Sequence, residues 1–420
     1  MAEITIPGFK TVPKTGVIYV IHKAIAMGYT PTDRVWANLG QGAPETGQIN
    51  GSSERLSVIN IEPDLCEYSH VAGQRELRQK VADLYNYLYR KNKKSQYSWE
   101  NVSIAGGGRV ALTRVAASLG NINLGHLIPD YTAYEELLSV FHSFVAIPIL
   151  SNPALKYQIS AEHMKDEIIG RGLKALLMSN PCNPTGQIIQ DEHLQRMLAM
   201  AREYQCTMIM DEFYSHYIYS DNNSKLPKFV SAAEYIEDIE TDPVVIIDGI
   251  TKNWRYPGLR VSWTLAPKEV IQTISSAGSF LDGGASHPIQ NRVLSLLDPA
   301  VIVQDAKALQ DCFREKRDYA TKRLRAMGIE IEAETQGTFY IWAKIANLPA
   351  PLNDGFKFFE AGLKQKVITV PGSFFDINPE KRRSYSRFNQ YVRISFGVSM
   401  TELQRGLDAI SRVIEQVTRR

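Results

Sequence analysis

The feature that most limits how this chain can fold is a repeated alternation of short apolar segments with amphipathic ones. The apolar segments carry mainly Val, Ile, Leu and Met, and the clearest span residues 102–105, 173–178, 205–210 and 244–247. Longer segments between them, such as 191–201, place apolar residues every three or four positions, as a helix with one buried face does. The alternation predicts βαβ units. We therefore expect an α/β fold with a mostly parallel central sheet flanked by helices.

The length and the charge of the chain narrow its class. A chain of 420 residues is too long for one small core, so we expect two domains, or one large domain with an appendage. The 47 Lys and Arg residues nearly balance the 45 Asp and Glu residues. The resulting net charge of +2 gives no global field that would attract nucleic acid, so no nucleic-acid partner is expected.

The cysteines and the apolar runs indicate the compartment. The four cysteines are far apart and form no CxxC pair, which argues against a zinc site or a disulfide framework, and we expect no metal. The first residues lack the pattern of a signal peptide, and no apolar run is long enough to span a membrane. We therefore expect a cytoplasmic protein without a membrane partner.

Polar or conformationally permissive residues follow the apolar segments at the points where strands are expected to end. These residues are Gly108, Tyr131, Asn183, Asp211 and Lys252. In an open parallel sheet, ligands collect beyond the carboxyl ends of the strands. We therefore expect these residues to meet at one edge of the sheet, where free amide groups of the helix that opens at Gly108 form an anion cradle.

Together these residue types describe a site for pyridoxal phosphate. Lys252 supplies the amine that forms a Schiff base with the aldehyde, and Asp211 pairs with the pyridine nitrogen and keeps it protonated. Tyr131 is expected to stack on the ring, and Asn183 and Tyr214 to hydrogen-bond its phenolate oxygen. The phosphate is expected at Gly108, Arg109 and Arg260.

The order of several short motifs along the chain resembles that of a known family. The motifs are Asn-Pro-Cys-Asn-Pro-Thr-Gly at 180–186, Asp-Glu-Phe-Tyr at 211–214, Lys252 with Arg260, Tyr-Val-Arg-Ile-Ser at 391–395, Gly-Gln-Gly-Ala-Pro at 40–44, Tyr68 with Gly73, and Val-Pro-Gly at 370–372. They extend roughly over residues 38–397. On these motifs the chain resembles the class I and II aminotransferases of fold type I, the aspartate-aminotransferase-like family.

The resemblance implies a division of the chain into parts. It implies a large cofactor-binding domain over residues 61–298. It also implies a small α+β domain built from both chain ends, with an N-terminal arm over residues 1–60 and a C-terminal portion over residues 299–420.

The resemblance also implies roles for residues that contact the substrate and the partner subunit. Arg393 matches the arginine that grips the substrate α-carboxylate through a planar pair of hydrogen bonds, with Gly42 and Asn183 beside the substrate. Tyr68 matches a tyrosine that reaches the cofactor phosphate of the neighbouring subunit. The resemblance therefore implies a homodimer that takes an amino acid and a 2-oxo acid as substrates.

The sequence departs from the family pattern where ligand contacts are expected. Many relatives have a serine three residues before the lysine, but this chain has Gly249, and Thr251 is the residue that can replace the lost phosphate contact. The segment 279–288 lacks the arginine with which dicarboxylate-specific relatives bind a second carboxylate. We therefore expect glutamate and aspartate to be poor primary donors compared with aromatic, aliphatic or basic amino acids.

A basic segment interrupts the C-terminal motifs. Residues 381–387 include Lys381, Arg382, Arg383 and Arg387. The segment is expected to be either a solvated loop or a mobile flap over an anionic substrate. As a flap, it would let an arginine bind glutamate as the second substrate.

The function expected from the residues and the resemblance is transamination in amino acid metabolism. A pyridoxal-phosphate-dependent aminotransferase would move the α-amino group of an L-amino acid to a 2-oxo acid through an aldimine of Lys252, which then acts as general base and acid. Elimination, replacement, cyclisation or oxidation of an amino acid from the same carbanion is the alternative. A cofactor-holding regulator would need a DNA-binding extension, and the chain ends are too short and not basic enough for one.

Overall fold

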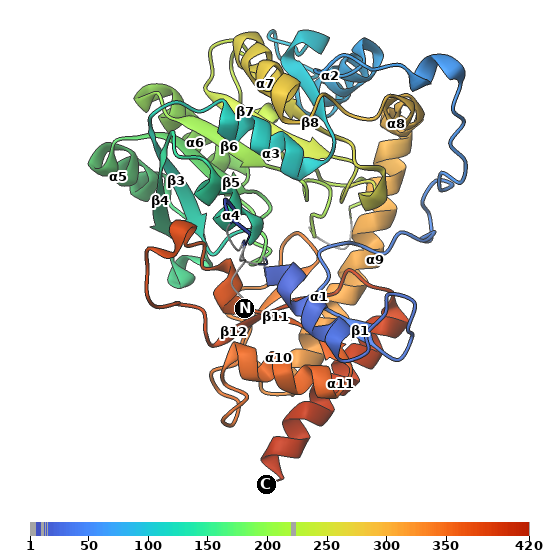
Figure 1. Cartoon of the computed structure of the whole chain (residues 1–420), viewed down its shortest axis with the longest axis vertical. Coiled ribbons are helices and arrows are strands. Elements are labelled where there is room, and N and C mark those ends of the chain that lie inside the picture. Colours follow the sequence, from blue (N-terminus) through green and yellow to red (C-terminus); the bar gives the residue numbers. More distant parts are fainter. Residues whose placement is uncertain (1–5, 10–11, 13, 15, 220–223, 420) are drawn as a thin grey trace.

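The largest element of the protein, in a computed structural model that describes residues 6–9, 12, 14, 16–219 and 224–419, is a seven-stranded sheet (Figure 1). Its strands lie in the order β2 (Val102–Ala105), β8 (Ser262–Leu265), β7 (Val244–Gly249), β6 (Thr207–Asp211), β5 (Leu173–Ser179), β3 (Asn123–Ile128) and β4 (Val145–Leu150). Neighbouring strands are parallel except at β8, which runs antiparallel to both β2 and β7. The predicted mostly parallel sheet is confirmed.

Both faces of the inner strands of this sheet are buried, which explains why these strands are mainly apolar, whereas the edge strand β4 is partly exposed. Successive residues of a strand point to opposite faces. In β7, Val244 and Ile246 belong to one hydrophobic cluster, whereas Val245 and Ile247 belong to another. Helices cover both clusters, as a parallel sheet requires.

The helices divide between the two faces of the sheet. One cluster includes residues of α2 (Arg75–Tyr89), α5 (Ala161–Arg171) and α6 (Asp191–Tyr204). The other includes residues of α3 (Gly108–Ala117), α4 (Ala133–Val140) and α7 (Lys268–Leu281). The short helix α8 (His287–Val293) follows α7. The helix expected over 191–201 is therefore present as α6.

A second, smaller unit combines residues from both ends of the chain (Figure 1). It contains a parallel pair, β1 (Ala37–Asn38) with β10 (Val367–Ile368), and an antiparallel sheet in the order β11 (Val370–Pro371), β12 (Tyr391–Ser395) and β9 (Tyr340–Lys344). Its helices are α1 (Gly16–Ala26), α10 (Gly355–Lys364) and α11 (Met400–Thr418). The predicted bounds 1–60, 61–298 and 299–420 stay a prediction.

The long helix α9 (Pro299–Ala326) starts beside α8 of the large unit and leads down to the smaller unit (Figure 1). The side chain of Asp298 caps its start by accepting a hydrogen bond from the amide of Ala300 at 2.9 Å, and a proline occupies the first helical position. Of the helices in the described ranges, none is both long and apolar enough to cross a membrane.

Candidate active site

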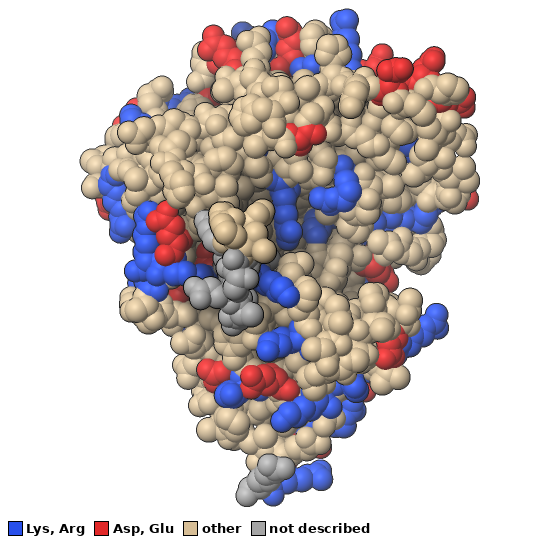
Figure 2. All heavy atoms as spheres, in the orientation of Figure 1, with Lys and Arg blue, Asp and Glu red and all other residues tan. Residues whose placement is uncertain are grey.

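A cavity of about 1010 Å³ opens at the carboxyl edge of the large sheet. Figure 2 shows Lys and Arg side chains gathered in a hollow between the two units of the molecule. The cavity is lined by every predicted site residue except Tyr68, namely Gly42, Gly108, Arg109, Tyr131, Asn183, Asp211, Tyr214, Thr251, Lys252, Arg260 and Arg393. The structure therefore brings together the residues that the sequence placed at one edge of the sheet.

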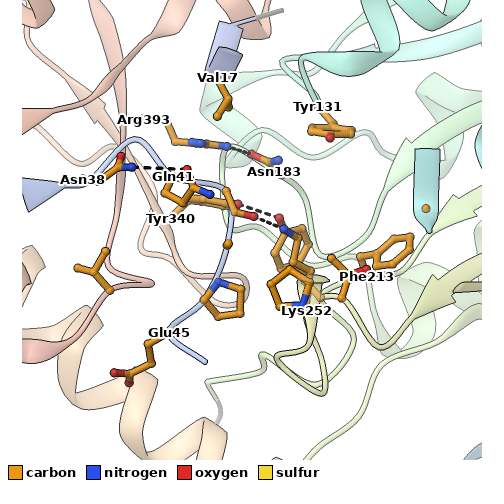
Figure 3. Close-up of a pocket in the computed structure, with 18 of the residues that line it drawn as sticks. Val17, Asn38, Gln41, Glu45, Tyr131, Asn183, Phe213, Lys252, Tyr340 and Arg393 are labelled. Carbon is orange, nitrogen blue, oxygen red and sulfur yellow. Dashed lines mark hydrogen bonds between the residues drawn. The ribbon is translucent and has the colours of Figure 1, made fainter. Parts of the chain in front are cut away.

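Lys252 stands at the centre of this set, on the loop that follows β7 (Figure 3). Its Nζ donates a hydrogen bond to the carbonyl oxygen of Gly42, which belongs to the smaller unit. Its own carbonyl oxygen accepts a hydrogen bond of 3.0 Å from the hydroxyl of Tyr217. The amine thus faces the cavity, while the hydrogen bond from Tyr217 holds the backbone of Lys252 in place.

The surroundings of Lys252 make its amine unusually easy to deprotonate. Burial, followed by the positive charges of Arg393, Arg260 and Arg109, lowers the pKa of Lys252 to about 7. The carboxylate of Asp211 acts in the opposite direction. A substantial fraction of the amine is therefore neutral near pH 7, which is the form that a nucleophile or a general base requires.

A buried acid fixes the loop that carries Lys252. Asp248, which is 2% exposed, accepts hydrogen bonds from the amide of Gly249 at 2.6 Å and from Nδ2 of Asn253 at 3.0 Å. The hydroxyls of Tyr85 and Ser215 donate to its other oxygen at 3.2 and 3.3 Å. The network holds both sides of the lysine loop, and the sequence pattern gave no indication of it.

The packing of β7 against β8 explains why the position three residues before the lysine is a glycine. A Cβ atom on Gly249 would lie 2.6 Å from Cα of Ser262 and 2.6 Å from the carbonyl oxygen of Val261. Backbone atoms cannot move aside cheaply, so a serine does not fit here. The hydroxyl of Thr251 is buried without a hydrogen-bond partner among the described residues, and it lines the cavity.

Asp211 closes β6, one strand away from the lysine. Its Oδ2 accepts a hydrogen bond of 2.7 Å from the hydroxyl of Tyr134, which lies in α4. Burial raises the pKa of Asp211 to about 6, against the hydrogen bonds of Tyr134 and of the Phe213 amide, which lower it. Tyr134 was missed at the sequence level, although it follows Tyr131 by one helical turn and that spacing places both rings on one side.

Arg393 is the most buried of the cations in the cavity, at 1% exposed. Its Nη1 donates to Oδ1 of Asn183 at 3.0 Å (Figure 3), and its Nη2 donates to the carbonyl oxygen of Gly40 at 2.8 Å. Its guanidinium carbon lies 4.0 Å from the centre of the Tyr340 ring. The flat face and both terminal nitrogens of Arg393 are therefore held in orientation by contacts within the protein.

Tyr340 also positions a predicted site residue. Its hydroxyl lies 2.8 Å from the hydroxyl of Tyr214. The two residues come from β9 and from the turn after β6, so no local pattern in the sequence relates them. Tyr340 is the second residue of the site that the sequence interpretation missed.

The part of the cavity at the start of α3 has the features of an anion site. Gly107 precedes α3 with φ of 102°, and no side chain caps the helix start. A Cβ atom on Gly107 would lie 2.0 Å from Nη2 of Arg260, so only a glycine lets that guanidinium approach the helix. Nε of Arg109 donates to the hydroxyl of Tyr131 at 3.3 Å. A helix start, two guanidinium groups and the unpartnered hydroxyl of Thr251 together fit a phosphate group.

Tyr68 and the basic segment 381–387, both singled out from the sequence, do not line the cavity. Tyr68 is 98% exposed and does not line the cavity of its own chain. In the segment 381–387, three of the four basic side chains pair with acids: Lys381 with Glu135, Arg382 with Glu380 and Arg383 with Asp376. The fourth, Arg387, donates to the hydroxyl of Tyr385 at 3.2 Å. The segment is therefore tied to its surroundings in this structure.

Comparisons with known proteins agree with this arrangement. A family model described as aminotransferase class I and II matches residues 34–410. The aspartate aminotransferase of Thermotoga maritima is 26% identical over 376 residues, which cover 89% of this chain and 90% of that protein. The aspartate/prephenate aminotransferase of Thermus thermophilus is 23% identical over 357 residues, 83% of either chain.

The fold is also that of solved aminotransferases. The structure of the aspartate aminotransferase of Thermus thermophilus with maleate superposes with a TM-score of 0.78 at 21% identity, and covers 96% of this chain and 97% of the other. The family match spans most of the chain and includes every predicted site residue that lines the cavity. The predicted fold type and the predicted transaminase activity are thereby confirmed, and the chain belongs to the class I and II aminotransferases.

Proposed function

We propose that this aminotransferase uses pyridoxal phosphate to move the α-amino group of a non-acidic L-amino acid to a 2-oxo acid. One observation carries the proposal: Lys252, Asp211 and Arg393 line one cavity, in which Arg260 approaches the start of α3 at Gly107. An amine, an acid, a carboxylate-binding guanidinium and an anion site are the separate contacts that the cofactor and an amino acid need.

The residues of the cavity fit the cofactor in one orientation. Asp211 would hold the pyridine nitrogen, while Tyr131 covers the ring and Asn183 and Tyr214 face the ring oxygen. The phosphate would lie at the start of α3, at Gly108, Arg109, Thr251 and Arg260. When it is bound there, the cofactor supplies an electron sink for the charge that develops at the substrate Cα.

Lys252 has two tasks in the proposal. Its neutral amine would hold the cofactor, and Nζ would take the proton from the substrate Cα. The low pKa of Lys252, about 7, supports both tasks because the amine must be free of a proton at the start of each. The same Nζ returns the proton, so one group serves as base and as acid.

Arg393 would bind the substrate α-carboxylate, and Gly42 would lie beside the side chain of the substrate. The cations that line the cavity in the described part of the chain are Arg109, Lys252, Arg260 and Arg393. Each already has a role at the phosphate, the amine or the α-carboxylate. A second carboxylate on the substrate would then lack a cation, which supports aromatic, aliphatic or basic amino acids as donors, although several relatives are named aspartate aminotransferases.

We also propose that the active protein is a homodimer in which Tyr68 reaches the cofactor phosphate of the partner. The side chains of Val58, Ile61, Tyr68 and Phe280 are all at least 60% exposed. Ser69 donates to the carbonyl oxygen of Ala285 at 3.2 Å, so the two segments that carry these side chains lie side by side. An exposed apolar surface of this kind is suited to cover by a second copy.

Complementation between two inactive variants tests the dimer. Lys252→Ala and Tyr68→Ala are each expected to be inactive or weak. A mixed dimer of the two restores one complete site, which contains Lys252 of one subunit and Tyr68 of the other. Activity that appears when the variants are co-expressed supports the proposal, and a strictly monomeric enzyme with full activity contradicts it.

The reaction is tested by single-turnover conversion of the purified holoenzyme with each amino acid in turn. Transamination predicts loss of the absorbance of the lysine-bound cofactor, formation of pyridoxamine phosphate and release of one 2-oxo acid, with neither oxygen uptake nor ammonia release. Ammonia release without any need for an acceptor would instead indicate elimination, and oxygen uptake would indicate oxidation. Either result would overturn transamination for this chain.

A further inference from the structure

The segment 375–387, which we call the clasp, lies between β11 and β12 and contacts the large unit at α4. Nζ of Lys381 forms an ion pair with Oε1 of Glu135, and the amide of Asn378 donates to Oε2 of the same carboxylate at 2.9 Å. The amide of Glu380 donates to the hydroxyl of Ser139 at 2.9 Å. Both oxygens of Glu135 are therefore bound by the clasp.

The clasp is held in shape by its own hydrogen bonds. Asp376, which is buried, accepts from Nη1 of Arg383 at 2.5 Å and from the amide of Arg387 at 2.7 Å. The side chain of Asn378 bonds the amide and the carbonyl oxygen of Arg383 at 3.0 and 2.9 Å. A loop closed on itself in this way presents Lys381 and the amide of Asn378 in a fixed arrangement.

Helix α4 depends on contacts of this kind. It has only eight residues, and no side chain caps its N-terminus. An isolated helix of this length is unstable in water. Its inner face is buried through Tyr134 and Leu138, and its outer face meets the clasp through Glu135 and Ser139. Each pair is spaced by one helical turn, and Glu135 directly follows Tyr134, so the clasp contacts the side of the helix that lies about 100° round from its buried face.

The buried face of α4 contacts the site through Tyr134. The hydroxyl of Tyr134 donates to Asp211 at 2.7 Å. A second contact of the clasp lies just before the helix, where the amide of Asp130 donates to the carbonyl oxygen of Phe375 at 3.2 Å. The ring of Phe375 also lies 5.0 Å from the guanidinium carbon of Arg393. The clasp thus contacts the segment that carries Tyr131 and Tyr134 on one side and Arg393 on the other.

We propose that Glu135 is a positioning residue: gripped by the clasp, it holds α4 so that the Tyr134 hydroxyl keeps its hydrogen bond to Asp211. The inference rests on the proposed function, because the ionisation of Asp211 matters only where the carboxylate serves a cofactor. It also assigns a structural task to the basic segment, in which Lys381, Arg382 and Arg383 pair with acids of the protein.

The first test is amide hydrogen exchange of residues 133–140 in the apoprotein and in the holoenzyme. Lys381→Ala removes the ion pair from the exposed side and leaves Glu135 in place, whereas Glu135→Ala removes both contacts. Exchange in α4 is expected to accelerate by roughly tenfold in either variant. The matched control is Arg382→Ala, because among the described residues Arg382 pairs only with Glu380 inside the clasp. Unchanged exchange in Lys381→Ala and Glu135→Ala would overturn the proposal.

The second test is a double-mutant cycle on the acid limb of the pH profile of kcat/KM. Titratable groups that face Asp211 are Tyr134, Lys252, Asp130 and Glu212. Glu135→Ala is expected to move the acid limb in the same direction as Tyr134→Phe, and to add little to it in the double variant. A shift of equal size in both backgrounds would mean that Glu135 acts by another route, and would refute the proposal. A wild-type enzyme that does not transaminate would refute the proposed function instead. Amide exchange in the apoprotein would still test the role of Glu135, because that measurement does not depend on activity.

Discussion

Replacing Tyr134 by phenylalanine removes one hydrogen bond from the site and little else. The ring stays, and with it the edge-to-face contact with Tyr131 at a centroid distance of 5.5 Å. Only the hydroxyl that donates to Asp211 at 2.7 Å is lost. A hydrogen bond to a charged group contributes about 1.5–3 kcal/mol, which corresponds to about 1–2 pH units in the ionisation of the carboxyl.

The direction of the effect follows from the position of Asp211. Burial already raises the pKa of Asp211 to about 6, and the Tyr134 hydroxyl is a leading influence that lowers it. Without that hydroxyl the pKa rises further, so the carboxylate is lost at a higher pH. The acid limb of kcat/KM is therefore expected to move upward by about 1–2 pH units. At alkaline pH the variant should regain activity close to that of the wild type.

The assay is the pH profile of kcat/KM for wild type and Tyr134→Phe with the same donor and acceptor, at saturating cofactor. The protonated cofactor nitrogen will itself lower the pKa of Asp211, so the comparison between the two proteins is informative and the absolute position of the limb is not. Profiles that coincide would refute the reasoning. A uniform loss of activity at every pH would also refute it, because the hydrogen bond acts through ionisation.

Other predictions concern the carboxylate site, the lysine strand and the core. Arg393→Lys is expected to raise KM for the amino donor by roughly tenfold to a hundredfold, because the planar two-bond fit and the stacking on Tyr340 are lost, whereas the Kd for the cofactor measured by titration should hardly change. Gly249→Ala should lower the unfolding free energy by about 1–3 kcal/mol, visible as a lower Tm, because its Cβ would collide with backbone atoms; an unchanged Tm would contradict the packing argument. Both ring nitrogens of His126 are buried without partners among the described residues, and burial lowers its pKa to about 4. The unfolded histidine titrates near pH 6.5, so the folded state binds fewer protons and loses stability as the pH falls from about 6.5 to about 4. His126→Leu should therefore remove about 2 kcal/mol of the stability difference between pH 7 and pH 5 in urea unfolding, and an equal difference in both proteins would refute this.

The sequence was sufficient for features that depend on local pattern. The strands of the large sheet could be predicted because both faces of its inner strands are buried, which makes segments such as 244–247 continuously apolar. The polar residues after them could be assigned to one edge because parallel strands end together. Lys252, Asp211 and Asn183 were predicted in this way, and all three line the same cavity.

Contacts between distant segments could not be predicted. Tyr340 meets Arg393 through the pairing of β9 with β12 and meets Tyr214 across the two units, and nothing near Tyr340 in the sequence indicates either contact. The contacts of the clasp could not be predicted either, because Lys381 pairs with Glu135 in the distant helix α4 and Arg383 pairs with Asp376 through the folding of the clasp itself. Asp248 was overlooked because a buried acid inside an apolar strand has no pattern other than its burial.

The central claim is that Lys252 carries the cofactor, and the most direct measurement is covalent trapping. The holoenzyme is reduced with borohydride and digested, and the peptide that carries the phosphopyridoxyl group is identified by mass spectrometry. The label is expected on Lys252 of the wild-type enzyme, with no label and a turnover lower by several orders of magnitude in Lys252→Ala. A label on a different lysine of the wild-type enzyme, or full activity in Lys252→Ala, would contradict it.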